Sequence, residues 1–172
     1  MARAIFLVGF MGAGKSTVGR ALARRLRWPF EDLDDRVQAR EGRTVELIFQ
    51  ESGEAAFREA EHSALKELLE SLGPEPRVVA LGGGAFVQAR NAALLEPEGI
   101  VSVFLDGPVE ELFRRCQQQS VERPLRRSLQ QFRELLELRR PHYMKSKLRI
   151  ETTSKNVEAV AGEIATRLGI DK

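Results

Sequence analysis

The sequence is poor in cysteine, in long apolar runs and in excess charge of either sign. With a single cysteine, Cys116, the chain cannot form an internal disulfide. This is typical of the reducing cytosol, so we expect a cytoplasmic protein. No apolar run is long enough to cross a membrane, and we expect no membrane partner. Lys and Arg number 27 against 25 Asp and Glu. This near balance argues against a nucleic-acid partner.

Internal repeats, low-complexity tracts and linkers are absent as well. The 172 residues, 42% of them hydrophobic, can fill one core. We therefore expect a single domain over residues 1–172. We also expect a monomer, although length and composition do not decide the oligomeric state. The first apolar run begins almost at Met1, so we expect no signal or transit peptide. The two histidines, His62 and His142, lack the spacing of metal ligands and are interpreted as structural.

The clearest motif is Gly-Phe-Met-Gly-Ala-Gly-Lys-Ser at residues 9–16, a Walker A loop. It follows an apolar run at 4–8 and precedes a stretch of helical periodicity, which is the context that a phosphate-binding loop needs. Backbone N–H groups and the helix N-terminus would hold the phosphates. Lys15 would lie near the β- and γ-phosphates, and the Ser16 hydroxyl would bind Mg²⁺. The nucleotide-binding residues expected in this loop are Gly12, Ala13, Gly14, Lys15, Ser16 and Thr17. The alternative is a simple glycine-rich turn.

Short apolar runs alternate with helical patterns along the whole chain. The runs predict strands at 4–8, 29–33, 77–81, 100–105 and 148–151. The helical patterns are found at 15–27, 35–40, 44–49, 53–72, 89–95, 109–117, 128–143 and 156–168. This alternation predicts an α/β fold with a parallel sheet covered on both faces. Ligands of such sheets bind at the carboxyl ends of the strands.

Three aspartates crowd the end of the second predicted strand. Asp32 and Asp34 would point to the same side if the strand continued past them. One could hold Mg²⁺ through water, and another could accept a proton or hydrogen bond from a hydroxyl substrate. Alternatively, Asp34 or Asp35 caps the following helix.

Three consecutive glycines, at 82–84, follow the third predicted strand. Without side chains, their backbone N–H groups can come close to a ligand. The alternative is a flexible connection. The fourth strand ends at Asp106 and looks like a Walker B strand, so Asp106 rivals Asp32 as a metal carboxylate. Its other interpretation is an aspartate in the turn before Pro108.

Arginines are the last signal. Arg123 lies in a polar stretch without apolar periodicity, which predicts a lid over about 117–127 that brings a guanidinium to the phosphoryl group. Arg139 ends a predicted helix, and Arg58 lies on another beside Phe57 and Glu61. Each arginine taken singly could equally belong to a solvated helix face.

Together these motifs resemble the shikimate kinase family. Arg58-x-x-Glu61-x-x-x-Leu65 and Val-Val-Ala-Leu-Gly-Gly-Gly-Ala-Phe at 78–86 are similar to the family's signature. The Walker A loop, Asp-x-Asp at 32–34, Arg-Pro-Leu at 123–125 and Arg-x-Pro-x-Tyr at 139–143 follow in the family's order. The resemblance covers nearly the whole chain. It implies a three-layer P-loop NTPase fold whose five parallel strands have the order 2-3-1-4-5, as in nucleoside monophosphate kinases.

The resemblance also implies an activity. Such enzymes transfer the γ-phosphoryl group of ATP to the 3-hydroxyl of shikimate with Mg²⁺. Lys15 and Ser16 would bind the phosphates and the metal, and Asp32, rather than Asp106, would hold the metal through water. Asp34 would bind the ring hydroxyls of shikimate, closest to the reacting one. The implied catalytic residues are Lys15, Asp34 and Arg123.

The remaining implied residues contact the two substrates. Arg58 and Arg139 would pair with the shikimate carboxylate in bidentate geometry. Arg123 would come from the lid, and Arg115 would stack on adenine. The helices over about 34–62 would carry the acceptor site. Its further contacts are the backbone of Gly83 and Gly84 and the side chains of Phe49 and Phe57.

Two other functions remain open from the residues. A kinase for another small polyol acid, such as gluconate, would share the loop and the fold, although Arg58 and the triple glycine weigh against it. A nucleotide-dependent sensor on this fold would be expected to lack a carboxylate or the lid arginine, yet Asp34 and Arg123 are present. A GTPase switch would need an Asn-Lys-x-Asp motif, which the sequence lacks.

Overall fold

A parallel β-sheet forms the centre of the computed structural model, which describes residues 2–118 and 128–171. Its strand order is β2-β3-β1-β4-β5, and every pairing is parallel, which confirms the predicted architecture. The strands are β1 (Ala4–Val8), β2 (Phe30–Asp32), β3 (Arg77–Ala80), β4 (Ile100–Asp106) and β5 (Leu148–Glu151). All residues of β1 are fully buried because helices cover both faces of this central strand.

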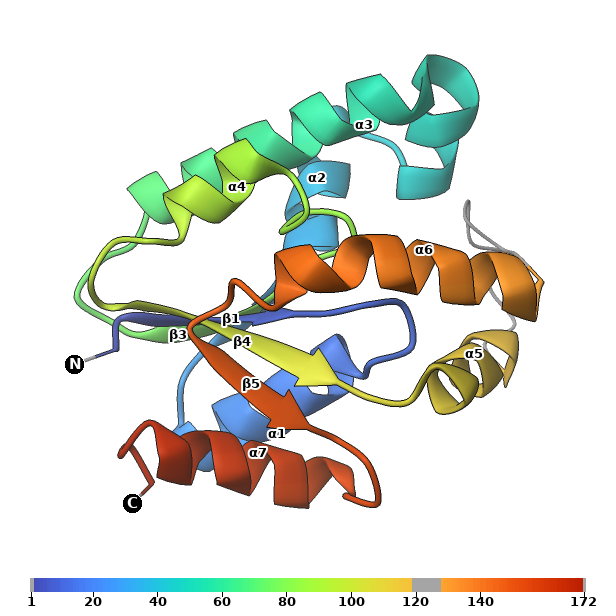
Figure 1. Ribbon diagram of the computed structural model, residues 1–172. Helices are drawn as coiled ribbons and strands as arrows, with labels where there is room; N and C mark the ends of the chain where they lie inside the picture. The colour runs from blue at the N-terminus through green and yellow to red at the C-terminus, as the bar shows by residue number, and fades with distance from the viewer. Residues whose placement is uncertain (1, 119–127, 172) are drawn as a thin grey trace.

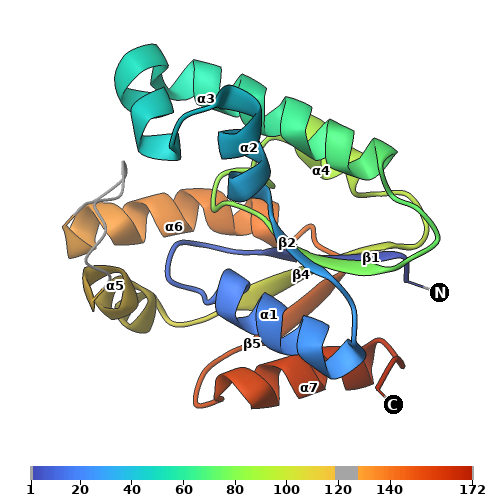
Figure 2. The ribbon, with the colours of Figure 1, turned by 180° about the vertical axis from the view of Figure 1, so that it is seen from behind.

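Helices on the two faces complete the three layers. They are α1 (Lys15–Leu26), α2 (Leu33–Glu41), α3 (Val45–Glu70), α4 (Ala89–Leu94), α5 (Val109–Gln118), α6 (Leu129–Tyr143) and α7 (Val157–Arg167). Helices α1 and α7 cover one face of the sheet, and α3, α4 and α6 cover the other (Figure 1). The reverse view shows α2 directly after β2, at the edge of the second layer (Figure 2). Among the described residues, no helix is long and apolar enough to span a membrane.

The second strand ends earlier than the sequence predicts. Helix α2 begins at Leu33, because the Asp32 carboxylate caps it and accepts a hydrogen bond from the Asp34 N–H at 3.0 Å. The expectation that Asp32 and Asp34 share one side of a continuing strand is therefore wrong. So is the alternative in which Asp34 or Asp35 supplies the cap. Asp34 instead lies in the first turn of α2, two residues beyond the capping residue.

Helix α3 joins two helices that the sequence predicts separately. Its backbone leaves helical geometry at Gly53, with φ 85° and ψ 175°, which produces a kink between the two predicted segments. Such a conformation favours glycine, since a Cβ is strained at this φ. The kink sets the first two turns of α3, which carry Phe49, at an angle to the longer segment, which carries Arg58.

Candidate active site

The phosphate loop runs from the end of β1 to the first turn of α1. Gly12 and Gly14 have φ values of 80° and 86°, and a Cβ on Gly12 would collide with the Leu112 carbonyl. The Lys15 ammonium donates hydrogen bonds to the carbonyls of Gly9 at 2.7 Å and Phe10 at 3.1 Å. It therefore lies over the loop, in front of the α1 N-terminus, where a phosphate would be stabilised.

Ser16 and Asp32 bring two oxygen atoms together beside this loop. The Ser16 hydroxyl donates a hydrogen bond to Asp32 Oδ2 at 2.7 Å, while Asp32 Oδ1 accepts from the Asp34 N–H. Hydroxyl and carboxylate oxygens are the ligands that Mg²⁺ prefers. Among the described residues, no group of three His, Cys, Asp or Glu side chains forms a metal site. A Mg²⁺ that arrives with nucleotide phosphates needs fewer protein ligands than that.

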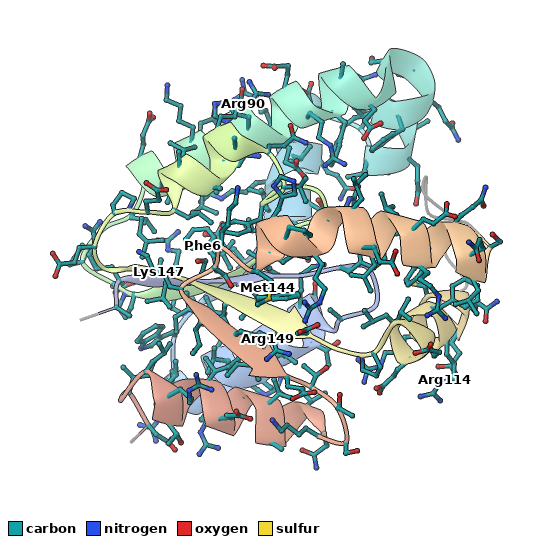
Figure 3. All side chains as sticks on the ribbon, viewed as in Figure 1. Phe6, Arg90, Arg114, Met144, Lys147 and Arg149 are labelled. Carbon is teal, nitrogen blue, oxygen red and sulfur yellow. The ribbon has the colours of Figure 1, made fainter. Side chains whose placement is uncertain are left out.

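Asp106, the rival carboxylate, is engaged elsewhere. Its Oδ2 accepts hydrogen bonds from Arg140 at 2.5 Å and Arg149 at 2.8 Å. Arg149 projects from β5, the edge strand beside β4 (Figure 3). Two guanidinium groups already neutralise this carboxylate, so the geometry favours Asp32 as the metal carboxylate.

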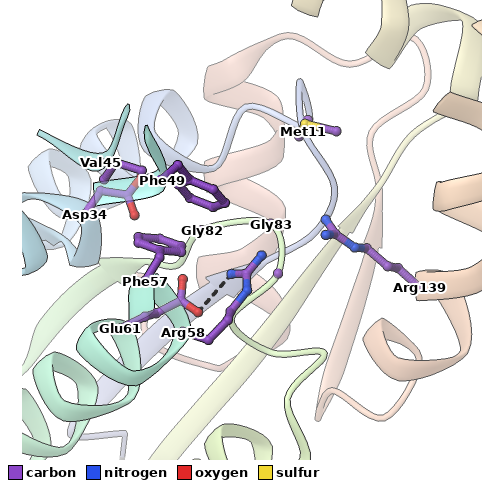
Figure 4. A pocket seen from close by; sticks show the side chains of 11 residues that line it. Met11, Asp34, Val45, Phe49, Phe57, Arg58, Glu61, Gly82, Gly83 and Arg139 are labelled. Carbon is purple, nitrogen blue, oxygen red and sulfur yellow. Dashed lines mark hydrogen bonds and ion pairs between the residues drawn. The ribbon is translucent and has the colours of Figure 1, made fainter. Parts of the chain in front are cut away.

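A second pocket opens beside the phosphate loop, on the side of β2 and β3 (Figure 4). Helix α2 supplies Asp34, α3 supplies an aromatic and charged wall, and α6 supplies Arg139. Met11 connects the pocket to the phosphate loop. The lining residues are Met11, Asp34, Val45, Phe49, Phe57, Arg58, Glu61, Gly82, Gly83, Gly84 and Arg139. Residues that the sequence predicts for the acceptor site, although distant along the chain, thus meet in one place.

Two arginines, Arg139 buried and Arg58 largely buried, point into this pocket from opposite sides (Figure 4). Arg58 pairs with Glu61 at 3.0 Å and lies over the Phe57 ring at 5.1 Å. Arg139 is 7% exposed and lies over the Phe10 ring at 5.8 Å. Arg58 Nε and one terminal nitrogen of Arg139 have no hydrogen-bond partner among the described residues. Buried donors of this kind require an acceptor, and a carboxylate between the two guanidinium groups would provide one.

A Cβ added at each position of the triple-glycine loop would meet a different neighbour. A Cβ on Gly84 would overlap the Arg58 guanidinium. A Cβ on Gly83 would lie 3.6 Å from the Arg139 guanidinium, at ordinary contact distance, and would narrow the pocket. A Cβ on Gly82 would press on two carboxylates, with 3.3 Å to Glu61 and 3.4 Å to Asp34. The loop is therefore a close-packed wall of the pocket rather than a flexible connection.

Glu61 is the site residue whose role the sequence did not indicate. It is fully buried, and burial raises its pKa to about 7, although the Arg58 charge acts in the opposite direction. The nearby Asp34 charge raises the pKa further. The three-residue interval from Arg58 to Glu61 on one helix is the signal that could have shown their contact. Met11 and Val45 were not expected as acceptor-site residues either, although each lines the pocket.

A larger pocket lies on the other side of the phosphate loop. It has a volume of about 370 Å³, and the end of α5, the segment after β5 and the start of α7 line it. Arg115 donates to the Gly12 carbonyl at 3.3 Å and pairs with Glu111 at 2.7 Å. Thr152, Lys155 and Asn156 form the far wall. This pocket extends from the phosphate end of the loop and fits a nucleoside. Arg123, expected on the lid, lies outside the described residues.

Known proteins resemble this chain over nearly its full length. A family model described as shikimate kinase matches residues 11–169. Shikimate kinase of Persephonella marina is 38% identical over 96% of this chain and 99% of its own length. That of Geobacter sulfurreducens is 43% identical over 95% of this chain and 90% of its own length.

Solved structures agree with these sequence relatives. Shikimate kinase from Acinetobacter baumannii, in complex with shikimate, superimposes with a TM-score of 0.89 at 36% identity, covering 100% of this chain and 96% of that one. The Aquifex aeolicus shikimate kinase gives 0.83 at 40% identity, covering 96% of each chain. A sugar kinase from Janibacter gives 0.71 at 16% identity and shares the fold alone.

A Walker A loop that separates a nucleoside-sized pocket from a smaller charged pocket defines a P-loop kinase of small molecules. The family model and the relatives then narrow the class. This chain belongs to the shikimate kinase family.

Proposed function

We propose that this chain transfers the γ-phosphoryl group of ATP to the 3-hydroxyl of shikimate, giving shikimate 3-phosphate and ADP. One observation carries the proposal. Asp34 and two largely buried arginines, each with an unsatisfied N–H, line one pocket beside the phosphate loop. A small acid with ring hydroxyls matches this set, because its carboxylate can take the arginines while a hydroxyl faces Asp34.

In this proposal Arg58 and Arg139 hold the substrate carboxylate from its two sides. Phe49 and Phe57, whose rings lie 4.8 Å apart, cover the apolar side of the ring. The backbone of Gly83 and Gly84 contacts the ring from the loop. Together these contacts turn the acceptor hydroxyl toward Met11 and the phosphate loop, and such positioning is the main source of rate in phosphoryl transfer.

Chemistry at the hydroxyl is assigned to Asp34 and Lys15. The Asp34 carboxylate would orient the attacking oxygen and accept its proton. Lys15 would neutralise the charge that develops between the β- and γ-phosphates, and Arg123 would add a second positive charge there. Gly12, Ala13, Gly14 and Thr17 would contact the phosphates, and Arg115 would stack on the adenine.

Ser16 and Asp32 would hold Mg²⁺, Asp32 through water. Their oxygens already lie 2.7 Å apart next to the loop, and that donor set fits the ion. When bound, Mg²⁺ screens the phosphate charge and orients the β- and γ-phosphates.

A coupled assay of ADP release tests the proposal, with shikimate, gluconate or no acceptor. We expect turnover with shikimate at least 100-fold above the other two, because a rigid ring can present its carboxylate to both arginines and a hydroxyl to Asp34 at once. Faster turnover with gluconate would make the chain a kinase for that polyol acid instead. Tight ATP binding with ADP release that neither acceptor stimulates would point to the nucleotide-dependent sensor.

The setting of the enzyme is part of the same proposal. We place it in the cytoplasm, where ATP is available. The cytosol keeps thiols reduced, and this chain, with one cysteine, does not depend on an internal disulfide. We expect the enzyme to act as a monomer. Sedimentation at working concentration checks this expectation.

A further inference from the structure

Tyr143 ends α6 and is the only tyrosine of the chain. It is fully buried, and its ring lies 5.2 Å from that of Phe104 in β4. Its hydroxyl donates a hydrogen bond of 2.5 Å to the Gly83 carbonyl, 60 residues away in the sequence. This bond joins α6 to the middle of the triple-glycine loop.

Helix α6 brings this hydroxyl and the Arg139 guanidinium to the loop together. The buried residues of α6 are Phe132, Leu136, Arg139 and Tyr143. Their intervals of four, three and four residues place them on one helical face. Arg139 and Tyr143 are thus neighbours one turn apart, and both approach Gly83: a Cβ there would lie 3.6 Å from the Arg139 guanidinium, and the Tyr143 hydroxyl donates to the Gly83 carbonyl.

The hydrogen bond also sets the direction of the next N–H. In a trans peptide the C=O of Gly83 and the N–H of Gly84 point to opposite sides, so a fixed carbonyl fixes the N–H. Two adjacent glycines have no side chains that would hold this peptide plane. Gly84 lies so close to the Arg58 guanidinium that a Cβ would overlap it. The orientation of one peptide therefore affects the surroundings of both arginines.

The Tyr143 hydroxyl keeps its proton and so remains a hydrogen-bond donor. Burial raises the pKa of Tyr143 to about 12, so it stays protonated at any physiological pH. The charges of Arg139 and Arg58 act in the opposite direction, but burial has the larger effect. An acidic group at this position would lose the donor and attract the guanidinium groups away from the substrate.

We propose that Tyr143 is a positioning residue for the substrate carboxylate. Its hydroxyl holds the Gly83–Gly84 peptide against Arg58 and Arg139, so that loop and arginines present one prearranged site to the acid. The inference rests on the proposed function, because it assumes that this pocket binds the acceptor. It adds a residue that does not line the pocket and acts through the loop.

Tyr143→Phe tests the inference, since it removes the hydroxyl and keeps the ring. We expect the KM for shikimate to rise about tenfold and the KM for ATP to stay within about twofold, because only the acceptor site loses its support. Ser102→Ala is the matched control. Ser102, also buried, accepts a hydrogen bond from the Lys147 N–H at 3.0 Å and joins β4 to the chain just after α6. That variant should keep both KM values.

Equal rises in both KM values, or the same shikimate effect in Ser102→Ala, would leave Tyr143 with a merely structural role. Wild-type KM for shikimate in Tyr143→Phe would overturn the inference while leaving the proposed function intact. Absence of shikimate-dependent ADP release in the wild type would instead remove the proposed function.

A second measurement covers the case in which Tyr143→Phe does not fold. Because the chain has one tyrosine, fluorotyrosine gives a single fluorine NMR signal from this position. We expect that signal to shift on addition of shikimate and to shift less with a non-hydrolysable ATP analogue. A signal that shikimate leaves unchanged would contradict the inference.

Discussion

Arg58 is held so closely that the shape of its guanidinium matters as well as its charge. It pairs with Glu61, lies over Phe57 and packs against Gly84 without room for a Cβ. Lysine retains the charge but loses the planar fork and the N–H that is now unsatisfied. A substitution that keeps the charge therefore separates geometry from electrostatics at this position.

We expect Arg58→Lys to raise the KM for shikimate by roughly 10- to 100-fold, which corresponds to one bidentate contact. Arg133→Lys is the control, because Arg133 makes an exposed pair with Glu110 and does not line the pocket. Steady-state kinetics at saturating ATP measures both variants. An unchanged KM in Arg58→Lys would show that this arginine does not bind the acceptor.

Asp34 is assigned the attacking hydroxyl, and its neighbour offers a matched control. Asp34→Asn should lower kcat by roughly 100-fold and leave ATP binding intact, since the amide can orient the oxygen but cannot take its proton. Asp35→Asn removes the next, exposed carboxylate of the same helix turn and should have little effect. Parallel loss of shikimate affinity would assign Asp34 to anchoring, and wild-type kcat would exclude both roles.

At the scale of elements, the kink in α3 sets the angle between the Phe49 segment and the Arg58 segment. Gly53→Ala would either strain the backbone, at a cost of about 1–2 kcal/mol, or straighten the helix. Either outcome moves Phe49 relative to Arg58, so we expect the KM for shikimate to rise several-fold. Thermal unfolding and kinetics together measure the two effects.

Gly42→Ala provides the comparison. Gly42 also has a positive φ, 67°, and like Gly53 it has open space around its Cβ position. Its substitution should lower stability by a similar amount, about 1 kcal/mol, without changing the acceptor KM. If both variants changed the KM equally, loss of stability rather than the kink would explain the effect.

At the scale of the whole molecule, Glu61 makes stability depend on pH. Its pKa is raised by burial from 4.5 to about 7 in the folded state. Between these two values the folded chain holds a proton that the unfolded chain releases, so stability falls as pH rises through this window. Glu61→Gln should remove this part of the slope, and the two proteins should differ by roughly 3 kcal/mol in their change from pH 4.5 to 7.5.

Urea unfolding at several pH values measures this difference. Comparing wild type with Glu61→Gln is necessary because other carboxylates act in the opposite sense. Glu31, for example, has a lowered pKa because Arg36 and Arg77 hold its charged form against the effect of burial. Parallel pH curves for the two proteins would contradict the raised pKa of Glu61.

The sequence predicted most of the fold because its signals are local. A run such as Ala4–Val8 is apolar throughout, and the Walker A glycines follow it directly, so strand, loop and helix can be predicted from neighbouring residues. Asp32 was missed as the cap because Asp34 and Asp35, within three residues of it, carry the same carboxylate that caps a helix. The pairing of Asp106 with Arg140 and Arg149 joins residues 34 and 43 positions away, which no local pattern indicates. The burial of Glu61 likewise depends on the packed fold.

The strand order divides the carboxyl edge of the sheet into two halves with different tasks. Segments after β2 and β3 build the pocket to which we assign the acceptor, and segments after β4 and β5 build the pocket to which we assign the nucleoside, with β1 between them. Among the described lining residues, Arg139 is the exception, since it reaches the acceptor half from α6, which lies between β4 and β5 in the chain. The choice of alcohol can therefore diverge in one half while the use of ATP stays constant in the other. A chimaera that exchanges the acceptor half must also exchange α6, or the new substrate will meet an arginine selected for the old one.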